Sequence, residues 1–175
     1  DDIIFAVGYK GGMVEEYFGD GSRFGIRARY AYEEELLGTA GAIKNAGKYV
    51  TDEQFFVLNG DTFYQMDFGD LSRIQQEKNL EMALVLRGVP DISRYGAARL
   101  TDGLLTAFNE KNGNTGAGTI NGGVYLMKRV LLDEIPEGKV SLENECIPRW
   151  MQEGRRLGGI ANDGYFIDIG VPGDY

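Results

Sequence analysis

The sequence contains no histidine and a single cysteine, Cys146. The absence of histidine excludes Ser-His-Asp and Cys-His catalysis, imidazole proton transfer and most transition-metal sites. One thiol can form neither an internal disulfide nor a zinc cluster, and the helical spacing of Cys146 with Ile147 and Trp150 predicts that it is buried. The groups left for chemistry are carboxylates, Lys and Arg side chains, backbone amides and a hard cation such as Mg²⁺.

Positive charge and long apolar runs are also scarce. Lys and Arg total 18 against 27 Asp and Glu, so the formal net charge is −9. A chain of that sign is not attracted over long range to a nucleic-acid backbone. Apolar stretches such as 55–58 and 124–127 fall far short of the roughly 20 residues that a bilayer-spanning helix needs. We therefore expect no nucleic-acid partner and no membrane span.

The length fits one domain. At 175 residues, a single core can remove roughly 70% of the unfolded surface from water, whereas two independent domains would be cramped. We expect residues 1–175 to form a single domain. The chain opens on the strand-like run DDIIF without an initiating Met or a basic segment, which predicts neither a signal peptide nor a natural start.

Helix-like and strand-like segments alternate, which is typical of a three-layer α/β sandwich. Helical spacing of apolar residues predicts helices at 13–18, 39–50, 71–78 and 142–153. Apolar runs and alternation predict strands at 3–7, 26–32, 55–58, 82–89, 95–100, 104–109, 120–127 and 165–169.

The central sheet is expected to be mixed and mainly parallel. The strand at 55–58 is short and apolar, as in the middle of a parallel sheet, and 3–7 reads as a buried strand. The strands from 82 onward should be more antiparallel, with a tight hairpin at Thr101-Asp102-Gly103.

Two aspartates at strand ends carry the strongest indication of chemistry. Asp61 follows the strand 55–58, at the sheet edge where open α/β sheets bind ligands. Asp168 lies between Ile167 and Ile169, so its carboxylate is expected to be partly buried, and a cation shared with Asp61 would offset the cost. The alternative is that Asp61 caps a turn and Asp168 pairs with an Arg.

A loop of small residues leads from a strand end into the predicted helix 39–50, and its members are Leu37, Gly38, Thr39 and Gly41. Exposed amides at a helix N-terminus suit a polar or anionic group, and small side chains let a planar base come close. The alternative is that Thr39 is a simple N-cap and the glycines serve the turn.

Two further segments carry polar side chains at strand ends or inside a strand. Glu110 and Lys111 follow a predicted strand and place an acid beside a base, although most such neighbours are solvated surface. Asn121 is followed inside a strand by Gly122 and Gly123. Consecutive glycines weaken a strand, and a ligand lying against the backbone is one reason to tolerate them.

Taken in order, these segments resemble those of the sugar-1-phosphate nucleotidylyltransferases over nearly the whole chain. Each motif is weak alone, but their common order makes coincidence improbable. The motifs are LGTAGA from 37, LNGD from 58, YG at 95–96, EK at 110–111, NGGVY from 121 and FIDIGVP from 166. Within the family, GTAGAIK, INGGVYL and YFIDIGVPGDY are most similar to the bacterial D-glycero-D-manno-heptose 1-phosphate guanylyltransferases.

The resemblance implies a Rossmann-like nucleotide-diphospho-sugar transferase fold. It also implies a cytoplasmic, Mg²⁺-dependent enzyme of nucleotide-sugar biosynthesis, for lipopolysaccharide or capsule. In its reaction a sugar 1-phosphate oxygen attacks the α-phosphorus of a nucleoside triphosphate, here GTP, and pyrophosphate leaves. Neither histidine nor a covalent nucleophile is needed, because the attacking group is already an anion that must be aligned and neutralised.

The resemblance also implies residue roles. Asp61 and Asp168 match the metal ligands, and with Lys111, which matches the lysine on the sugar phosphate, they form the implied catalytic set. The implied nucleotide-binding residues are Leu37, Gly38, Thr39, Gly41 and Asp61. The implied sugar-phosphate-binding residues are Gly96, Glu110, Lys111, Asn121 and Gly122.

One departure from the family is large. Its Gly-Gly-x-Gly-Thr-Arg phosphate loop and the Pro-Lys-Pro segment that follows are not found in these 175 residues, and the run at 8–12 does not replace them. We expect the chain to lack the family's first strand, phosphate loop and first helix.

Three questions stay open at this level. Mannose or glucose 1-phosphate would suit the same side chains, and no side chain reads guanine unambiguously. A non-catalytic regulatory relative could bind nucleotide-sugars without a phosphate loop, although it would have no need for both Asp61 and Asp168. The sequence also leaves open whether the protein is a homo-oligomer.

Overall fold

The computed structural model describes residues 1–93, 97–109 and 115–170. Its helices are α1 (Gly11–Phe18), α2 (Gly38–Ala46), α3 (Phe68–Glu77), α4 (Val130–Glu134) and α5 (Ile147–Gln152), and a π-helical turn spans Leu142–Cys146. Its strands are β1 (Asp2–Val7), β2 (Arg27–Tyr32), β3 (Gln54–Leu58), β4 (Thr62–Tyr64), β5 (Met82–Val89), β6 (Ala97–Thr101), β7 (Leu104–Asn109), β8 (Gly118–Lys128), β9 (Leu157–Ala161) and β10 (Phe166–Asp168). In the described parts of the chain, no helix is long and apolar enough to cross a membrane.

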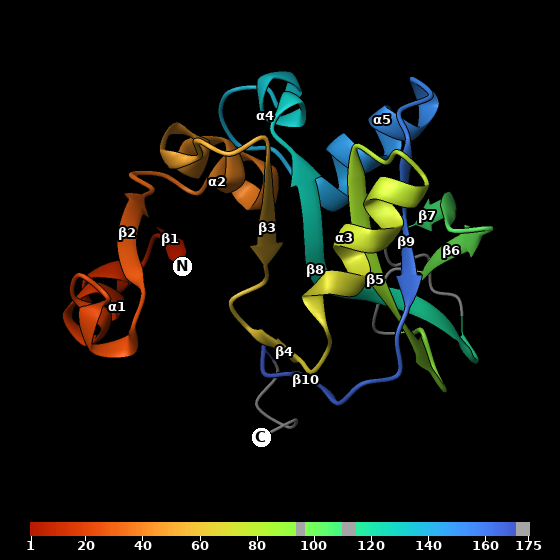
Figure 1. Cartoon of the computed structure of the whole chain (residues 1–175), viewed down its shortest axis with the longest axis horizontal. Helices are drawn as coiled ribbons and strands as arrows, with labels where there is room; N and C mark the ends of the chain where they lie inside the picture. The colour runs from red at the N-terminus through yellow and green to blue at the C-terminus, as the bar shows by residue number, and fades with distance from the viewer. Residues whose placement is uncertain (94–96, 110–114, 171–175) are drawn as a thin grey trace.

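Six strands form the main sheet, in the order β3-β8-β5-β9-β7-β6, while β1–β2 and β4–β10 form two small sheets beside it (Figure 1). The sheet is mixed, as predicted. Among the described strands, parallel pairing is confined to β1 with β2 and β5 with β9, so antiparallel pairs predominate where we expected mainly parallel ones.

The strand at 55–58 accounts for much of this difference. β3 lies at an edge of the main sheet and pairs antiparallel with β8, rather than lying in the middle of a parallel sheet. Phe56 and Leu58 are accordingly 39% and 55% exposed. A short apolar run indicates a strand but carries no information on the direction of its neighbour.

The hairpin between β6 and β7 is confirmed. Thr101 pairs with Leu104, which leaves Asp102 and Gly103 as a two-residue loop. Both loop residues have positive φ, 51° and 78°. A type I′ turn requires this conformation at both positions, and Asp-Gly is among the sequences that adopt it most readily.

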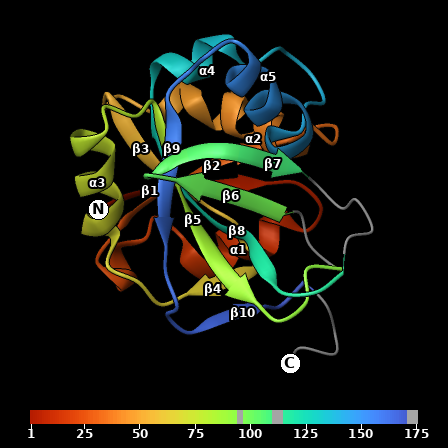
Figure 2. The ribbon, with the colours of Figure 1, turned by 90° about the vertical axis from the view of Figure 1, so that its right-hand side faces the viewer.

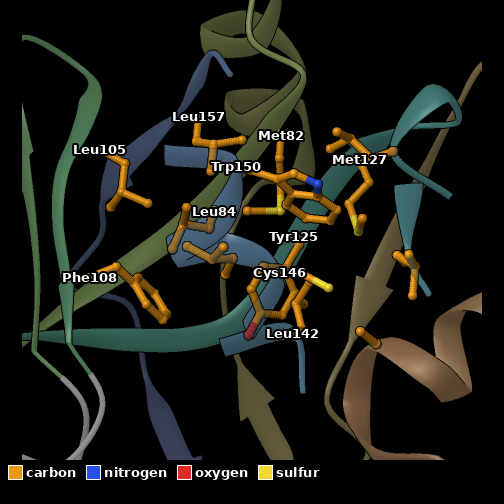
Figure 3. Close-up of a cluster of buried hydrophobic side chains, with 14 of the residues drawn as sticks. Met82, Leu84, Leu105, Phe108, Tyr125, Met127, Leu142, Cys146, Trp150 and Leu157 are labelled. Carbon is orange, nitrogen blue, oxygen red and sulfur yellow. The ribbon is translucent and has the colours of Figure 1, made fainter. Parts of the chain in front are cut away.

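Helices cover both faces of the main sheet, which confirms the three-layer sandwich (Figure 2). Alternate residues of β5 belong to two separate cores. Met82 and Leu84 pack with Trp150 in the core beneath α2, α4 and α5 (Figure 3). Ala83 packs on the other face with Leu71 of α3. The strict alternation of a strand therefore builds both cores from one segment.

β1, β2 and α1 form a smaller body beside α2 (Figure 1). Phe5 of β1 stacks on Phe18 of α1 and on Tyr30 of β2, with ring centroids 4.8 and 5.5 Å apart. We expected β1 to be buried, but only Val7 is, and Ile3 is 38% exposed. The exposure follows because β1 pairs with β2 alone among the described strands.

Cys146 is 1% exposed, as predicted, and burial raises the pKa of its thiol. Because the thiolate is the reactive form, we expect the folded protein to resist Ellman's reagent near neutral pH. The urea-unfolded protein should react fully within minutes under the same conditions. Comparable labelling rates for folded and unfolded protein would contradict a packed position for Cys146.

Candidate active site

Asp61 and Asp168 lie close together at the end of the molecule formed by β4 and β10 (Figure 1). A Cβ atom built on Gly170 would lie 3.0 Å from Asp61 Oδ2 and 3.1 Å from Asp168 Oδ1, so the two oxygens are at most about 6 Å apart. Two carboxylates more than a hundred residues apart in the sequence therefore face one point, where one hydrated cation could contact both.

Backbone hydrogen bonds hold the two acidic residues in this arrangement. Thr62 of β4 pairs with Asp168 of β10 in an antiparallel ladder. The Ile169 amide donates to the Asp61 carbonyl oxygen at 2.8 Å, and the Gly170 amide donates to Asp168 Oδ1 at 3.0 Å. The main chain after β10 thus holds the backbone of Asp61 through Ile169 and the carboxylate of Asp168 through Gly170.

No Arg or Lys forms an ion pair with Asp61 or Asp168 within the described residues, so the alternative of an Asp168–Arg pair is not found there. Asp61 is exposed and Asp168 is half-buried. The part of the chain that the structure describes contains no group of three or more His, Cys, Asp or Glu side chains that could hold a metal ion. A cation bound here would complete its shell with water or substrate oxygens, which is the coordination that Mg²⁺ favours.

The small residues at the start of α2 are explained by packing inside the protein. Gly38 has φ of 70°, and a Cβ on it would lie 2.6 Å from the Val140 carbonyl oxygen. A Cβ on Gly41 would clash with the Gly138 carbonyl oxygen. The amides of Ala40 and Gly41 both donate to the Val140 oxygen, at 3.0 and 3.2 Å. The hydrogen-bonding capacity of these two helix amides is therefore already used inside the protein.

The Thr39 hydroxyl does not cap the helix that begins beside it. Leu37, rather than Thr39, is the N-cap of α2. Thr39 Oγ1 donates to Glu143 Oε2 at 2.6 Å and accepts from the Leu142 amide at 2.7 Å. The Thr39 hydroxyl therefore links the start of α2 to the π-helical turn.

Asn121 lies on β8 and is connected to the same glutamate through Tyr125. Its Nδ2 donates to the Tyr125 hydroxyl at 2.5 Å, and its Oδ1 accepts from the Gly123 amide at 3.1 Å. The Tyr125 hydroxyl donates to Glu143 Oε1 at 3.1 Å. The structure therefore joins Thr39 and Asn121, which the sequence placed in separate motifs, through one carboxylate.

The glycine pair that follows Asn121 on β8 also has an internal explanation. A Cβ on Gly122 would lie 2.6 Å from the Tyr64 ring, and a Cβ on Gly123 would lie 2.9 Å from Asn59 Nδ2. Burial raises the pKa of Tyr64, whose neutral hydroxyl donates to the Asn162 carbonyl oxygen. Protein side chains therefore fill the space that a Cβ at either position would take, so internal packing accounts for both glycines.

Gly96, Glu110 and Lys111, three of the residues implied for the sugar phosphate, lie outside the described residues. Their roles stay predictions from the resemblance.

Glu143 and Tyr125 were not singled out by the sequence. Glu143 stands between apolar positions of a helical run, where most acids are solvated. Tyr125 reads as one apolar residue of a buried strand. Only the fold, which lays the π-helical turn against β8, reveals their contact (Figure 3 shows Tyr125 beside Leu142).

A mixed sheet sandwiched between helices, with paired carboxylates at one end, places the protein among α/β enzymes of the nucleotide-diphospho-sugar transferase fold. A family model described as Nucleotidyl transferase matches residues 1–175, and the chain belongs to that family.

Individual relatives span the whole chain. The chain is 36% identical over 176 residues to a D-glycero-alpha-D-manno-heptose 1-phosphate guanylyltransferase of Aneurinibacillus thermoaerophilus, and the match covers 100% of this chain and 75% of the relative. An enzyme of the same name from Campylobacter jejuni is 38% identical, with 99% and 76% covered. The crystal structure of HddC from Yersinia pseudotuberculosis complexed with GMP-PN superimposes with a TM-score of 0.83 at 30% identity, with 99% of this chain and 75% of that chain covered.

Proposed function

We propose that the protein transfers a guanylyl group from GTP to D-glycero-D-manno-heptose 1-phosphate, releasing pyrophosphate and forming a nucleotide-sugar. The observation that carries this proposal is the 36% and 38% identity, over essentially the whole chain, to two heptose 1-phosphate guanylyltransferases. The complex of HddC with GMP-PN supports guanine as the base.

The reaction asks for alignment and neutralisation of charge. An oxygen of the sugar phosphate attacks the α-phosphorus, the bond to the pyrophosphate oxygen breaks, and no proton has to move. Asp61 and Asp168 are proposed to hold Mg²⁺, which when bound neutralises charge on the triphosphate. Main-chain hydrogen bonds hold the backbone of Asp61 and the carboxylate of Asp168 before substrate arrives, so little reorganisation is needed during the reaction.

We assign the substrates to the two sides of the Glu143 carboxylate. The start of α2, with Leu37, Gly38, Thr39 and Gly41, is proposed to lie against the nucleotide. Asn121 and Gly122 of β8, with Gly96, Glu110 and Lys111, are proposed to bind the sugar phosphate. Residues 1–175 are proposed to work as one nucleotidyltransferase domain in the cytoplasm. The match of the family model over this whole range supports a single domain.

The test is a substrate matrix with the full-length protein. GTP, ATP, CTP, UTP and dTTP are each combined with heptose, mannose or glucose 1-phosphate and Mg²⁺, and pyrophosphate release is followed. We expect the highest kcat/KM for GTP with the heptose. A preference for UTP or dTTP with glucose 1-phosphate would refute the guanylyltransferase assignment. Tight nucleotide-sugar binding without turnover would instead favour a regulatory relative.

A further inference from the structure

Glu143 lies between the two groups of residues that we assign to the two substrates. Its Oε2 accepts a hydrogen bond from Thr39 at 2.6 Å, and its Oε1 accepts one from the Tyr125 hydroxyl at 3.1 Å. Tyr125 in turn accepts from Asn121. The side chain of Glu143 is half-buried, so these bonds are partly shielded from water.

We propose that Glu143 is a positioning residue that couples the nucleotide side of the site to the sugar side. This inference rests on the proposed function, because it takes Thr39 and Asn121 as members of the two substrate sites. Glu143 acts through these two residues and is not assigned a contact with substrate.

The direction of the hydrogen bonds supports this role. An ionised carboxylate only accepts, so the hydroxyls of Thr39 and Tyr125 must both point their protons at Glu143. The Tyr125 oxygen is then turned toward Asn121 as an acceptor, and receives its Nδ2. The Asn121 Oδ1 consequently faces the Gly123 amide, which only donates. The negative charge of Glu143, acting through Tyr125, and the Gly123 amide thus favour the same orientation of the Asn121 amide.

A glutamine in place of Glu143 would disrupt this arrangement of donors and acceptors. Its side chain has one acceptor and one donor group, whereas both neighbours require an acceptor. If the glutamine amide faced Tyr125, it would place a donor where the tyrosine hydroxyl now has the Glu143 acceptor. If it faced Thr39, the threonine hydroxyl would receive both that amide and the Leu142 amide, and it too would lose its acceptor.

Glu143 also stands in an unusual backbone conformation. It lies in the π-helical turn Leu142–Cys146, which follows Ser141. π-Helical turns are rare and occur frequently at functional sites. Ser141 Oγ also lies 3.4 Å from Glu143 Oε2, so the carboxylate has several partners. A purely structural tie between α2 and the turn is the alternative, and it predicts lost stability without a selective change in substrate affinity.

The experiment measures KM for GTP and for heptose 1-phosphate separately, with the full-length protein, for Glu143→Gln and Tyr125→Phe. Glu145→Gln is the matched control, because it makes the same charge change in the same turn. Glu145 accepts a hydrogen bond from the Ser141 amide rather than from Thr39. We expect Glu143→Gln to raise both KM values about tenfold, as for loss of a hydrogen bond to a charged group, with a smaller change in kcat.

Tyr125→Phe separates the Tyr125–Glu143 hydrogen bond from the Thr39–Glu143 hydrogen bond. It removes the link to Asn121 but leaves Thr39 bonded to Glu143, so we expect KM to rise for the sugar phosphate alone. The double variant that combines Glu143→Gln with Tyr125→Phe should raise the KM for the sugar phosphate no further than Glu143→Gln does. Both substitutions break the same series of hydrogen bonds from Glu143 through Tyr125 to Asn121. Glu145→Gln should keep both KM values within about twofold of wild type, as expected for a surface substitution.

The outcomes are distinguishable. No transfer by the unsubstituted protein would overturn the proposed function, and this inference with it. Wild-type transfer with both KM values unchanged in Glu143→Gln would overturn the inference alone. A lower melting temperature of Glu143→Gln with both KM values unchanged would show that Glu143 only stabilises the contact between α2 and the π-helical turn. If Glu143→Gln fails to fold, Tyr125→Phe decides, because an unchanged sugar KM in that variant also overturns the inference.

Discussion

Replacing either Asp61 or Asp168 with Asn is expected to lower kcat/KM for guanylyl transfer at least about a hundredfold, because metal neutralisation of a reacting phosphoryl group contributes several kcal/mol. Both carboxylates face the point beside Gly170, so each variant removes one of the two charges proposed to hold the metal ion. An amide is nearly the same size as a carboxylate. The Ile169 amide donates to the Asp61 backbone oxygen, and the Gly170 amide donates to an Asp168 oxygen that Asn keeps as its Oδ1, so both bonds can persist. The fold should therefore survive.

The measurement is a Mg²⁺ titration of pyrophosphate release together with a thermal melt. We expect each variant to need more Mg²⁺ for half-maximal rate while its melting temperature stays close to that of the unsubstituted protein. Asp163→Asn is the control, because this exposed aspartate lies just before β10 and outside the pair. An unchanged Mg²⁺ requirement in both Asp61→Asn and Asp168→Asn would remove the shared metal site from the mechanism.

The sequence predicted elements where local chemistry decides them. Asp102-Gly103 forms the expected two-residue turn because few other pairs take positive φ at both positions. The apolar residues of β5 predict a buried strand, and their alternation supplies both cores. These features need no knowledge of the rest of the chain.

The sequence could not predict what depends on distant partners. The glycines at 38, 41 and 122 read equally well as room for a ligand or room for the protein, and only the fold shows Val140, Gly138 and Tyr64 in that space. The direction of β3 depends on β8, and the role of Glu143 depends on Thr39 and Tyr125. The proximity of Asp61 and Asp168, by contrast, was predicted, since family resemblance supplied the pairing that spacing could not.

Trp150→Ala is expected to have the largest effect on stability, about 3–5 kcal/mol. This side chain is 0% exposed and packs with Met82 and Leu84 between the sheet and α5 (Figure 3). Truncation leaves a cavity that the surrounding sheet cannot close. For a domain of this length each kcal/mol corresponds to roughly 2–4 °C, so the melting temperature should fall by about 10 °C.

Trp150→Phe separates packing from polarity at the same position. The indole Nε1 is buried and has no hydrogen-bond partner among the described residues. An unpaired buried donor costs about 1–3 kcal/mol, and phenylalanine removes that cost while keeping most of the apolar volume. We therefore expect Phe to be much less destabilising than Ala. Urea unfolding followed by far-UV circular dichroism measures both, with Tyr9→Ala as the control because Tyr9 is 92% exposed. If Phe proved as destabilising as Ala, the indole N–H would have to contribute favourably to the core, and the packing explanation would be wrong.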